Sequence, residues 1–199
     1  MCCKGSVDRT IRICDTRENK YTKSQITIQA HDSDVNVISW NPLKSYLLAS
    51  GADDGCFKIW DLRYDKTCMT ELLWHNESIT SIAFQPNEES VLAVSSADNR
   101  ISLWDFAVEP DDEADKDEDI PDQLMFLHQG QEDVKELSFH PIYWEMIIST
   151  SNTGFHLFKP NLNDEGNDGE EGENEEDETK IPKIREEDLD KYLEKMSLN

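Results

Sequence analysis

The sequence has little positive charge and no long apolar run, and both shortages exclude classes of protein. Lysine and arginine number 19 against 43 acidic residues, so the formal net charge is −24. A chain this acidic repels a phosphate backbone, so we expect no direct binding to nucleic acid. No apolar stretch approaches the roughly 20 residues that cross a bilayer, and no signal-peptide pattern is visible. We therefore expect no association with a membrane.

The cysteines lack the number and the spacing that are typical of disulfide frameworks or zinc sites. The five cysteines are odd in number and contain no Cys-x-x-Cys pair. These features argue against a disulfide scaffold and against a zinc site, and reduced thiols are typical of the cytosol or nucleus. No phosphate-binding loop occurs either, so no metal and no cofactor are expected. The cysteines are Cys2, Cys3, Cys14, Cys56 and Cys68.

The most informative feature that is present is an internal repeat. "LLASGADDGCFKIWDLR" at 47–63 is followed 44 residues later by "VLAVSSADNRISLWDFA" at 91–107. An earlier copy places Asp8 46 residues before Asp54, and a later one places Asn152 54 residues after Asp98. Self-similarity at a fixed period of this length indicates stacked supersecondary units, each burying a face against its neighbour.

Each period contains short strand-like runs and one histidine. His31, His75 and His128 precede the repeated Asp or Asn position by 23, 23 and 24 residues. The runs between and after them are rich in β-branched and aromatic residues and are separated by turn-forming residues. Four such runs in about 40–45 residues, with Trp-Asp near the end of the third, are typical of one propeller blade. The repeat therefore predicts an all-β fold.

The repeated polar residues have a structural explanation. A buried imidazole needs partners for both nitrogens, and a buried indole N–H needs an acceptor. We expect a carboxylate and a strand hydroxyl to satisfy them, which would form one network in each blade. The predicted members are His31, Ser50, Asp54 and Trp60; His75, Ser96, Asp98 and Trp104; and His128 with Thr150.

A His-Asp pair beside serines also occurs in catalytic triads. An active site is needed only once in a chain, whereas this set recurs with the period of the fold. We therefore interpret it as scaffold, and we expect a chain without enzymatic activity.

These motifs resemble the WD-repeat propellers, and the resemblance covers residues 1 to about 158. Within that superfamily, "AHDSDVNVISWNP", "FLHQGQEDVKELSFHP" and "SGADDGCFKIWDLR", with an acidic insertion after "WDFAVE", resemble the C-terminal blades of glutamate-rich WD-repeat proteins. Members of that group assemble the large ribosomal subunit. A broader relative is the retinoblastoma-associated group of histone chaperones, which has a similar insertion.

The resemblance implies a partial propeller. Complete members have about seven blades, but this sequence contains three full signatures and the second half of one more, about three and a half blades. We interpret the chain as a fragment that lacks N-terminal blades needed for closure, or as one that needs another chain. The expected organisation is a partial propeller over 1–160 with an insertion at 109–122, an acidic disordered linker over 161–180, and a short amphipathic helix within 181–199.

Acidic residues concentrate in two segments that could bind a basic partner. Residues 109–122 contain nine acids and one lysine, a net charge of −8, and residues 164–178 contain ten acids and no base. The resemblance implies that an insertion at the first place contacts a basic helix of a client protein. A solvated loop or tail without a partner is the alternative for each segment. The predicted partner-binding acids are Asp111, Asp112, Glu113, Asp115, Asp117, Glu118 and Asp119.

The resemblance therefore implies a protein-binding chaperone of the nucleus and nucleolus. An additional cytoplasmic pool is compatible with it. Its client would be a basic protein of the large ribosomal subunit, and histones are the alternative client. A third interpretation rests on "WDLR", where Asp61 and Arg63 resemble a box by which some propellers join cullin ubiquitin ligases as substrate receptors.

Overall fold

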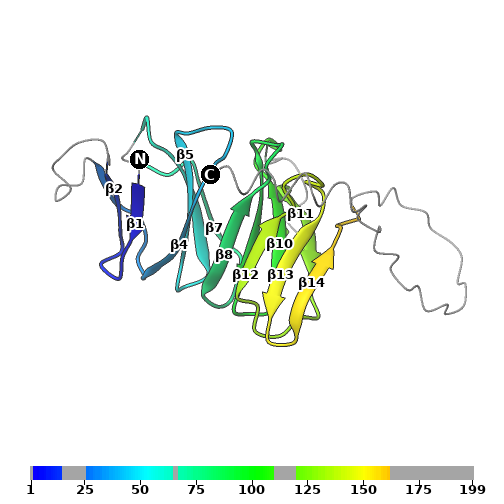
Figure 1. Ribbon diagram of the computed structural model, residues 1–199. Helices are drawn as coiled ribbons and strands as arrows, with labels where there is room; N and C mark the ends of the chain where they lie inside the picture. The colour runs from blue at the N-terminus through cyan, green and yellow to red at the C-terminus, as the bar shows by residue number, and fades with distance from the viewer. Residues whose placement is uncertain (1, 15–25, 65–66, 110–119, 162–199) are drawn as a thin grey trace, which may run out of the picture. The chain divides into compact units, whose positions relative to one another are not determined.

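The fold is all-β. The computed structural model describes residues 2–14, 26–64, 67–109 and 120–161, and within these it contains fourteen strands and no helix. The strands form four antiparallel sheets of three, four, four and three strands, which follow one another in chain order (Figure 1). Each sheet is a meander in which chain neighbours pair.

The strands lie close to the runs expected from the sequence. The first sheet contains β1 (Cys2–Gly5), β2 (Thr10–Cys14) and β3 (Ile26–Gln29). The second contains β4 (Val35–Trp40), β5 (Leu47–Ala52), β6 (Cys56–Asp61) and β7 (Thr70–Leu73). The third contains β8 (Ile79–Phe84), β9 (Val91–Ser96), β10 (Ile101–Asp105) and β11 (Leu124–His128). The fourth contains β12 (Glu136–Phe139), β13 (Ile147–Ser151) and β14 (Gly154–Phe158).

The repeat period reappears in the turns. Arg9, Gly55 and Asn99 hold the same place in three successive hairpins and all have positive φ, at 66°, 81° and 67°. Each follows the repeated aspartate, whose carboxylate accepts a backbone N–H two residues ahead. Asp before a left-handed residue is favourable turn chemistry, since its side chain can close the turn on its own backbone.

The hydrophobic core lies between successive sheets. Ile11 and Ile13 of β2 pack with Trp60 of β6 in one cluster, and Phe57 of β6 packs with Trp104 of β10 in the next. A third cluster joins β10 to β12 and β13 and includes Phe158 at its margin. The aromatic residue near the end of each third strand therefore packs against the preceding sheet, which makes the sheets stack as blades.

The structure confirms the prediction of an all-β, partial propeller. Strands β4, β8 and β12 begin their sheets and contact one another in order. The first and last sheets have three strands each among the described residues, and an incomplete blade was expected only for the first. The expected linker and helix lie almost entirely in 162–199, outside the described residues, so these domain boundaries stay a prediction. None of the described segments forms a helix with the length and hydropathy needed to cross a lipid bilayer.

Candidate functional site

The third sheet contains a complete network around His75. His75 Nδ1 lies 3.1 Å from Asp98 Oδ2, and His75 Nε2 lies 2.8 Å from the hydroxyl of Ser102. The indole N–H of Trp104 donates to the same hydroxyl at 2.7 Å. One proton arrangement satisfies all four groups: the indole donates to serine, serine to the imidazole, and the imidazole to the carboxylate.

The second sheet contains only part of this network. Trp60 donates to Ser50 Oγ at 2.9 Å, and Ser50 Oγ lies 2.7 Å from His31 Nε2. His31 Nδ1, however, is buried without a hydrogen-bond partner. Asp54 lies exposed in the turn, where it accepts the backbone N–H of Cys56 at 3.1 Å. The predicted contact between His31 and Asp54 is therefore not formed as a hydrogen bond.

The hydroxyl of the third sheet comes from a residue that we did not predict. Ser50 is paired across strands with Lys58, and one period later the corresponding pair is Val94 and Ser102. The hydroxyl thus moves from one member of the cross-strand pair to the other. The assignment of Ser96 was wrong, because its hydroxyl points to the carbonyl of Glu77 at 2.8 Å.

The fourth sheet does not repeat the network. His128 is a strand residue at the end of β11, and its ring stacks on Phe158 with centroids 4.1 Å apart. The hydroxyl of Thr150 donates to the carbonyl of Glu136, 3.5 Å away. The assignment of Thr150 was therefore wrong. His128 does join a polar network, but with other partners: Gln131 Nε2 donates to His128 Nε2 at 2.8 Å, and Ser149 Oγ donates to Gln131 Oε1 at 2.7 Å.

Burial sets the protonation of the two network histidines. The pKa of His31 is lowered from 6.5 to about 4, chiefly because burial disfavours the charged ring, with the Lys58 ammonium acting in the same direction. The pKa of His75 is also lowered, first by burial, although Asp98 opposes the shift. Both rings are therefore neutral near pH 7 and suited to hydrogen bonding or ligation.

The corrected assignment gives a direct prediction. We expect Ser102→Ala to lower the free energy of unfolding by about 2–4 kcal/mol, because Trp104 Nε1 and His75 Nε2 both lose their buried partner. We expect Ser96→Ala to cost about 1–1.5 kcal/mol, because it removes the bond to the Glu77 carbonyl and a longer bond, of 3.2 Å, from the Asp98 backbone N–H, but leaves no imidazole or indole without a partner. Urea unfolding of both variants measures the difference. Equal costs would contradict the network as described.

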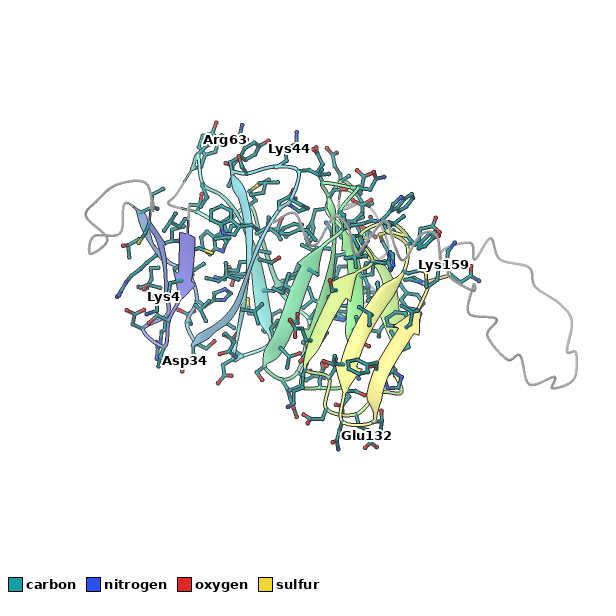
Figure 2. The ribbon with its side chains drawn as sticks, in the orientation of Figure 1. Lys4, Asp34, Lys44, Arg63, Glu132 and Lys159 are labelled. Carbon is teal, nitrogen blue, oxygen red and sulfur yellow. The ribbon has the colours of Figure 1, made fainter. Side chains whose placement is uncertain are left out.

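Asp61 and Arg63 pair with each other. Arg63 Nη2 lies 2.6 Å from Asp61 Oδ2, and both Arg63 Nε and its backbone N–H donate to Asp61 Oδ1. This contact lowers the pKa of Asp61. The guanidinium also lies 3.8 Å from the ring centroid of Tyr46. The Asp61 side chain is 6% exposed and that of Arg63 is 58% exposed, so the arginine is the member available to a partner at this edge (Figure 2).

The acidic insertion leaves and rejoins one sheet. It connects β10 to β11, which pair antiparallel, and the backbone N–H of Asp105 donates to the carbonyl of Gln123 at 2.9 Å. Residues 110–119 lie outside the described residues, so the seven predicted partner-binding acids stay a prediction. The paired strands nonetheless place both ends of the segment at one edge of the third sheet.

An apolar pocket that we did not predict lies on the third and fourth sheets. Its volume is about 280 Å³, and its lining includes Val91, Leu103, Met125, Phe139 and Trp144. Met125 is only three residues beyond the end of the acidic insertion, a distance of about 10 Å in a strand. Met125 and Trp144 are 36% and 40% exposed. No local pattern marks these residues, because the pocket joins segments that lie far apart in the sequence, from Gln85 to Asn161.

Comparison with known proteins agrees with this geometry. The model of the family described as "WD domain, G-beta repeat" matches residues 22–61 and 66–105. These two segments are WD40 repeats. The two matched WD40 repeats end on β6 and β10, at the two Trp-Asp pairs.

Several curated WD40 relatives extend the comparison. Ribosome assembly protein rrb1 of Schizosaccharomyces pombe is 46% identical over 77% of this chain and 35% of its own length. Protein HEAT STRESS TOLERANT DWD 1 of Arabidopsis thaliana is 42% identical over 78% of this chain and 46% of its own. Histone-binding protein MSI1 of Saccharomyces cerevisiae is 26% identical over 80% and 34%. The chain therefore spans about a third to a half of the length of these relatives.

Proposed function

We propose that this WD40 chain is part of a non-enzymatic chaperone for assembly of the large ribosomal subunit, acting in the nucleus and nucleolus. It would hold a newly made basic ribosomal protein until that protein meets ribosomal RNA. The similarity to the ribosome assembly protein rrb1, at 46% identity, supports the process. The net charge of −24 supports a basic client rather than a nucleic acid.

The observation that carries the proposal is an apolar pocket lined by Met125, which follows the end of the acidic segment 109–122 by three residues in the sequence. Nine acids in 109–122 attract and neutralise positive charge, but exposed ion pairs contribute only about 0–1 kcal/mol each. A stable complex also needs buried apolar contacts, which concentrate binding energy in a few anchors. At about 280 Å³, the pocket is at the small end for a free ligand and suits one or two side chains of a protein partner.

Histones are the second candidate client. Histones are also basic, and the similarity of this chain to histone-binding protein MSI1, at 26% identity, supports them as clients. The role as a receptor of a cullin ubiquitin ligase rests on Asp61 and Arg63 alone. Because Arg63 is paired to Asp61 and stacked on Tyr46, an adaptor would have to bind this pair intact or break it.

Affinity capture from nuclear extract, followed by mass spectrometry, tests the proposal. We expect a basic protein of the large ribosomal subunit to be enriched on the wild-type chain and lost on Met125→Glu, which puts a charge into the apolar pocket. Phe155→Glu is the matched control, since Phe155 is 81% exposed on β14 and is not a pocket residue. Enrichment of histones would favour the second candidate, and enrichment of a cullin adaptor the third. If the wild type, Met125→Glu and Phe155→Glu capture the client equally, the pocket does not anchor it and this part of the proposal is contradicted.

A further inference from the structure

The incomplete network of the second sheet leaves a buried nitrogen without a partner in a residue that lies close to other metal-ligand atoms. His31 is 3% exposed and its Nδ1 atom has no partner. A ring nitrogen of His31, a carboxylate oxygen of Asp54 and the Sγ atom of Cys56 all lie within 4.8 Å of one another. Since Nε2 already contacts Ser50 Oγ at 2.7 Å, Nδ1 is the nitrogen left for a ligand. One period later, His75 uses the corresponding nitrogen to contact Asp98.

Cys56 is what distinguishes this blade from the next. Its counterpart one period later is Arg100, which carries no ligand atom for a cation. Cys56 is 5% exposed, and burial raises the pKa of its thiol to about 12. A thiol in such a place is inert alone, but a bound metal ion supplies the charge that stabilises the thiolate.

A carboxylate completes the surroundings of these three residues. Glu71 Oε1 lies 3.9 Å from Cys56 Sγ, and its strand β7 pairs with β6. Glu71 and the three ligand residues line a single recess of about 160 Å³. Lys58 also lines it, with Nζ 3.0 Å from Glu71 Oε2. The recess, which Asp32 also lines, therefore offers nitrogen, sulfur and three carboxylates, with one ammonium that opposes a cation.

We propose that this recess binds Zn²⁺ through His31 Nδ1, the Asp54 carboxylate and the Cys56 thiolate, with Glu71 as the fourth ligand. Mixed nitrogen, sulfur and oxygen ligands suit zinc, whereas Mg²⁺ and Ca²⁺ prefer oxygen alone. The His31 ring already has a fitting outer contact, because its Nε2–H can donate to Ser50 Oγ, 2.7 Å away.

Zinc binding would require the three ligand atoms to move slightly closer together. Zinc–ligand bonds of about 2.0–2.3 Å place tetrahedral ligands roughly 3.3–3.8 Å apart, compared with separations of up to 4.8 Å for the three atoms here. Asp54 is exposed at a hairpin tip and can rotate toward the two buried ligands. On binding, the thiol of Cys56 releases its proton to solvent and the sulfur donates its electron pair to the metal. The ion would then join the loop before β4 to the β5–β6 hairpin.

Titration of the chelator-treated full chain with Co²⁺ and Zn²⁺ tests the site. We expect one tight equivalent of Co²⁺ with a thiolate-to-metal charge-transfer absorption, displaced by Zn²⁺, and a higher melting temperature with Zn²⁺. Cys56→Ser is expected to lose the absorption and at least about tenfold in Zn²⁺ affinity. Cys14→Ser, which removes a thiol on β2, is the matched control and is expected to bind like the wild type. Lys58→Gln is expected to bind roughly three- to tenfold more tightly, because it removes a repelling charge.

A second substitution of a proposed ligand, which is expected to leave the fold intact, distinguishes loss of binding from misfolding. Asp54→Asn retains an oxygen that can accept the Cys56 N–H and so preserves the hairpin, yet it should weaken Zn²⁺ binding by a similar factor. If Co²⁺ binds without the thiolate-to-metal charge-transfer absorption, its ligands are carboxylates of the acidic segments and not Cys56, and the proposal is overturned. The same conclusion would follow if Asp54→Asn and Cys56→Ser both bound Zn²⁺ like the wild type, or if Cys14→Ser lost binding equally.

Discussion

Replacing Trp104 with alanine is expected to lower the free energy of unfolding by about 3–5 kcal/mol, the cost of truncating a buried aromatic side chain. Trp104 has no exposed surface and lies between the second and third sheets. Its ring lies 5.2 Å from that of Phe57 and meets Trp74 edge to face at 5.9 Å. The substitution also leaves Ser102 without its indole donor. Since the free energy of unfolding of a whole domain is about 5–15 kcal/mol, this one substitution is expected to remove a large fraction of it.

Urea unfolding followed by tryptophan fluorescence measures the effect. Trp144→Ala is the matched control, because Trp144 is 40% exposed, lines the pocket and belongs to none of the three core clusters. We expect a cost below about 1 kcal/mol there. Trp60→Ala, at 3% exposure in the first cluster, is expected to resemble Trp104→Ala. Equal costs for Trp104 and Trp144 would contradict the packing of blade against blade described above.

Neutralising the acidic insertion is expected to slow association with a basic client by about tenfold or more at low salt. The change replaces the acids at 111, 112, 113, 115, 117, 118 and 119 with Asn or Gln and keeps the length of the segment. Charge steering raises association rates by about 10–10³-fold, and salt screens it over about 8–10 Å. The variant should therefore also lose most of the salt dependence of its association rate, while dissociation changes less.

Stopped-flow mixing at several salt concentrations, with a purified basic protein of the large ribosomal subunit, measures these rates. Neutralising seven acids within 164–178 is the control, because it removes the same charge from the other acidic segment. Equal rates and salt slopes for the insertion variant and the wild type would make the insertion a passive connector between β10 and β11. A loss confined to the control variant would assign steering to 164–178 instead.

The sequence by itself determined the blades. Strand formation and turns depend on local patterns, so alternation, β-branched residues and Asp in the turns located strands such as β4 and β14 within a residue or two. The fixed period then implied that Trp60 and Trp104 would lie in equivalent places. Stacking follows, since a single meander cannot bury both of its faces alone. The nature and position of the acidic insertion also followed from composition.

Only the tertiary structure decided which side chains meet. Ser102 rather than Ser96 closes the network because cross-strand pairing sets Ser102 opposite Val94, and that register is not visible in one strand. His128 lies at the end of β11 rather than in the loop before β12, because of the insertion and the changed spacing, so Gln131 links it to Ser149. The cluster of His31, Asp54 and Cys56 lies across 26 residues of sequence with no metal-motif spacing. It forms because the β5–β6 hairpin folds back onto the loop before β4, where Asp53 N–H donates to the Asp34 carbonyl at 3.0 Å.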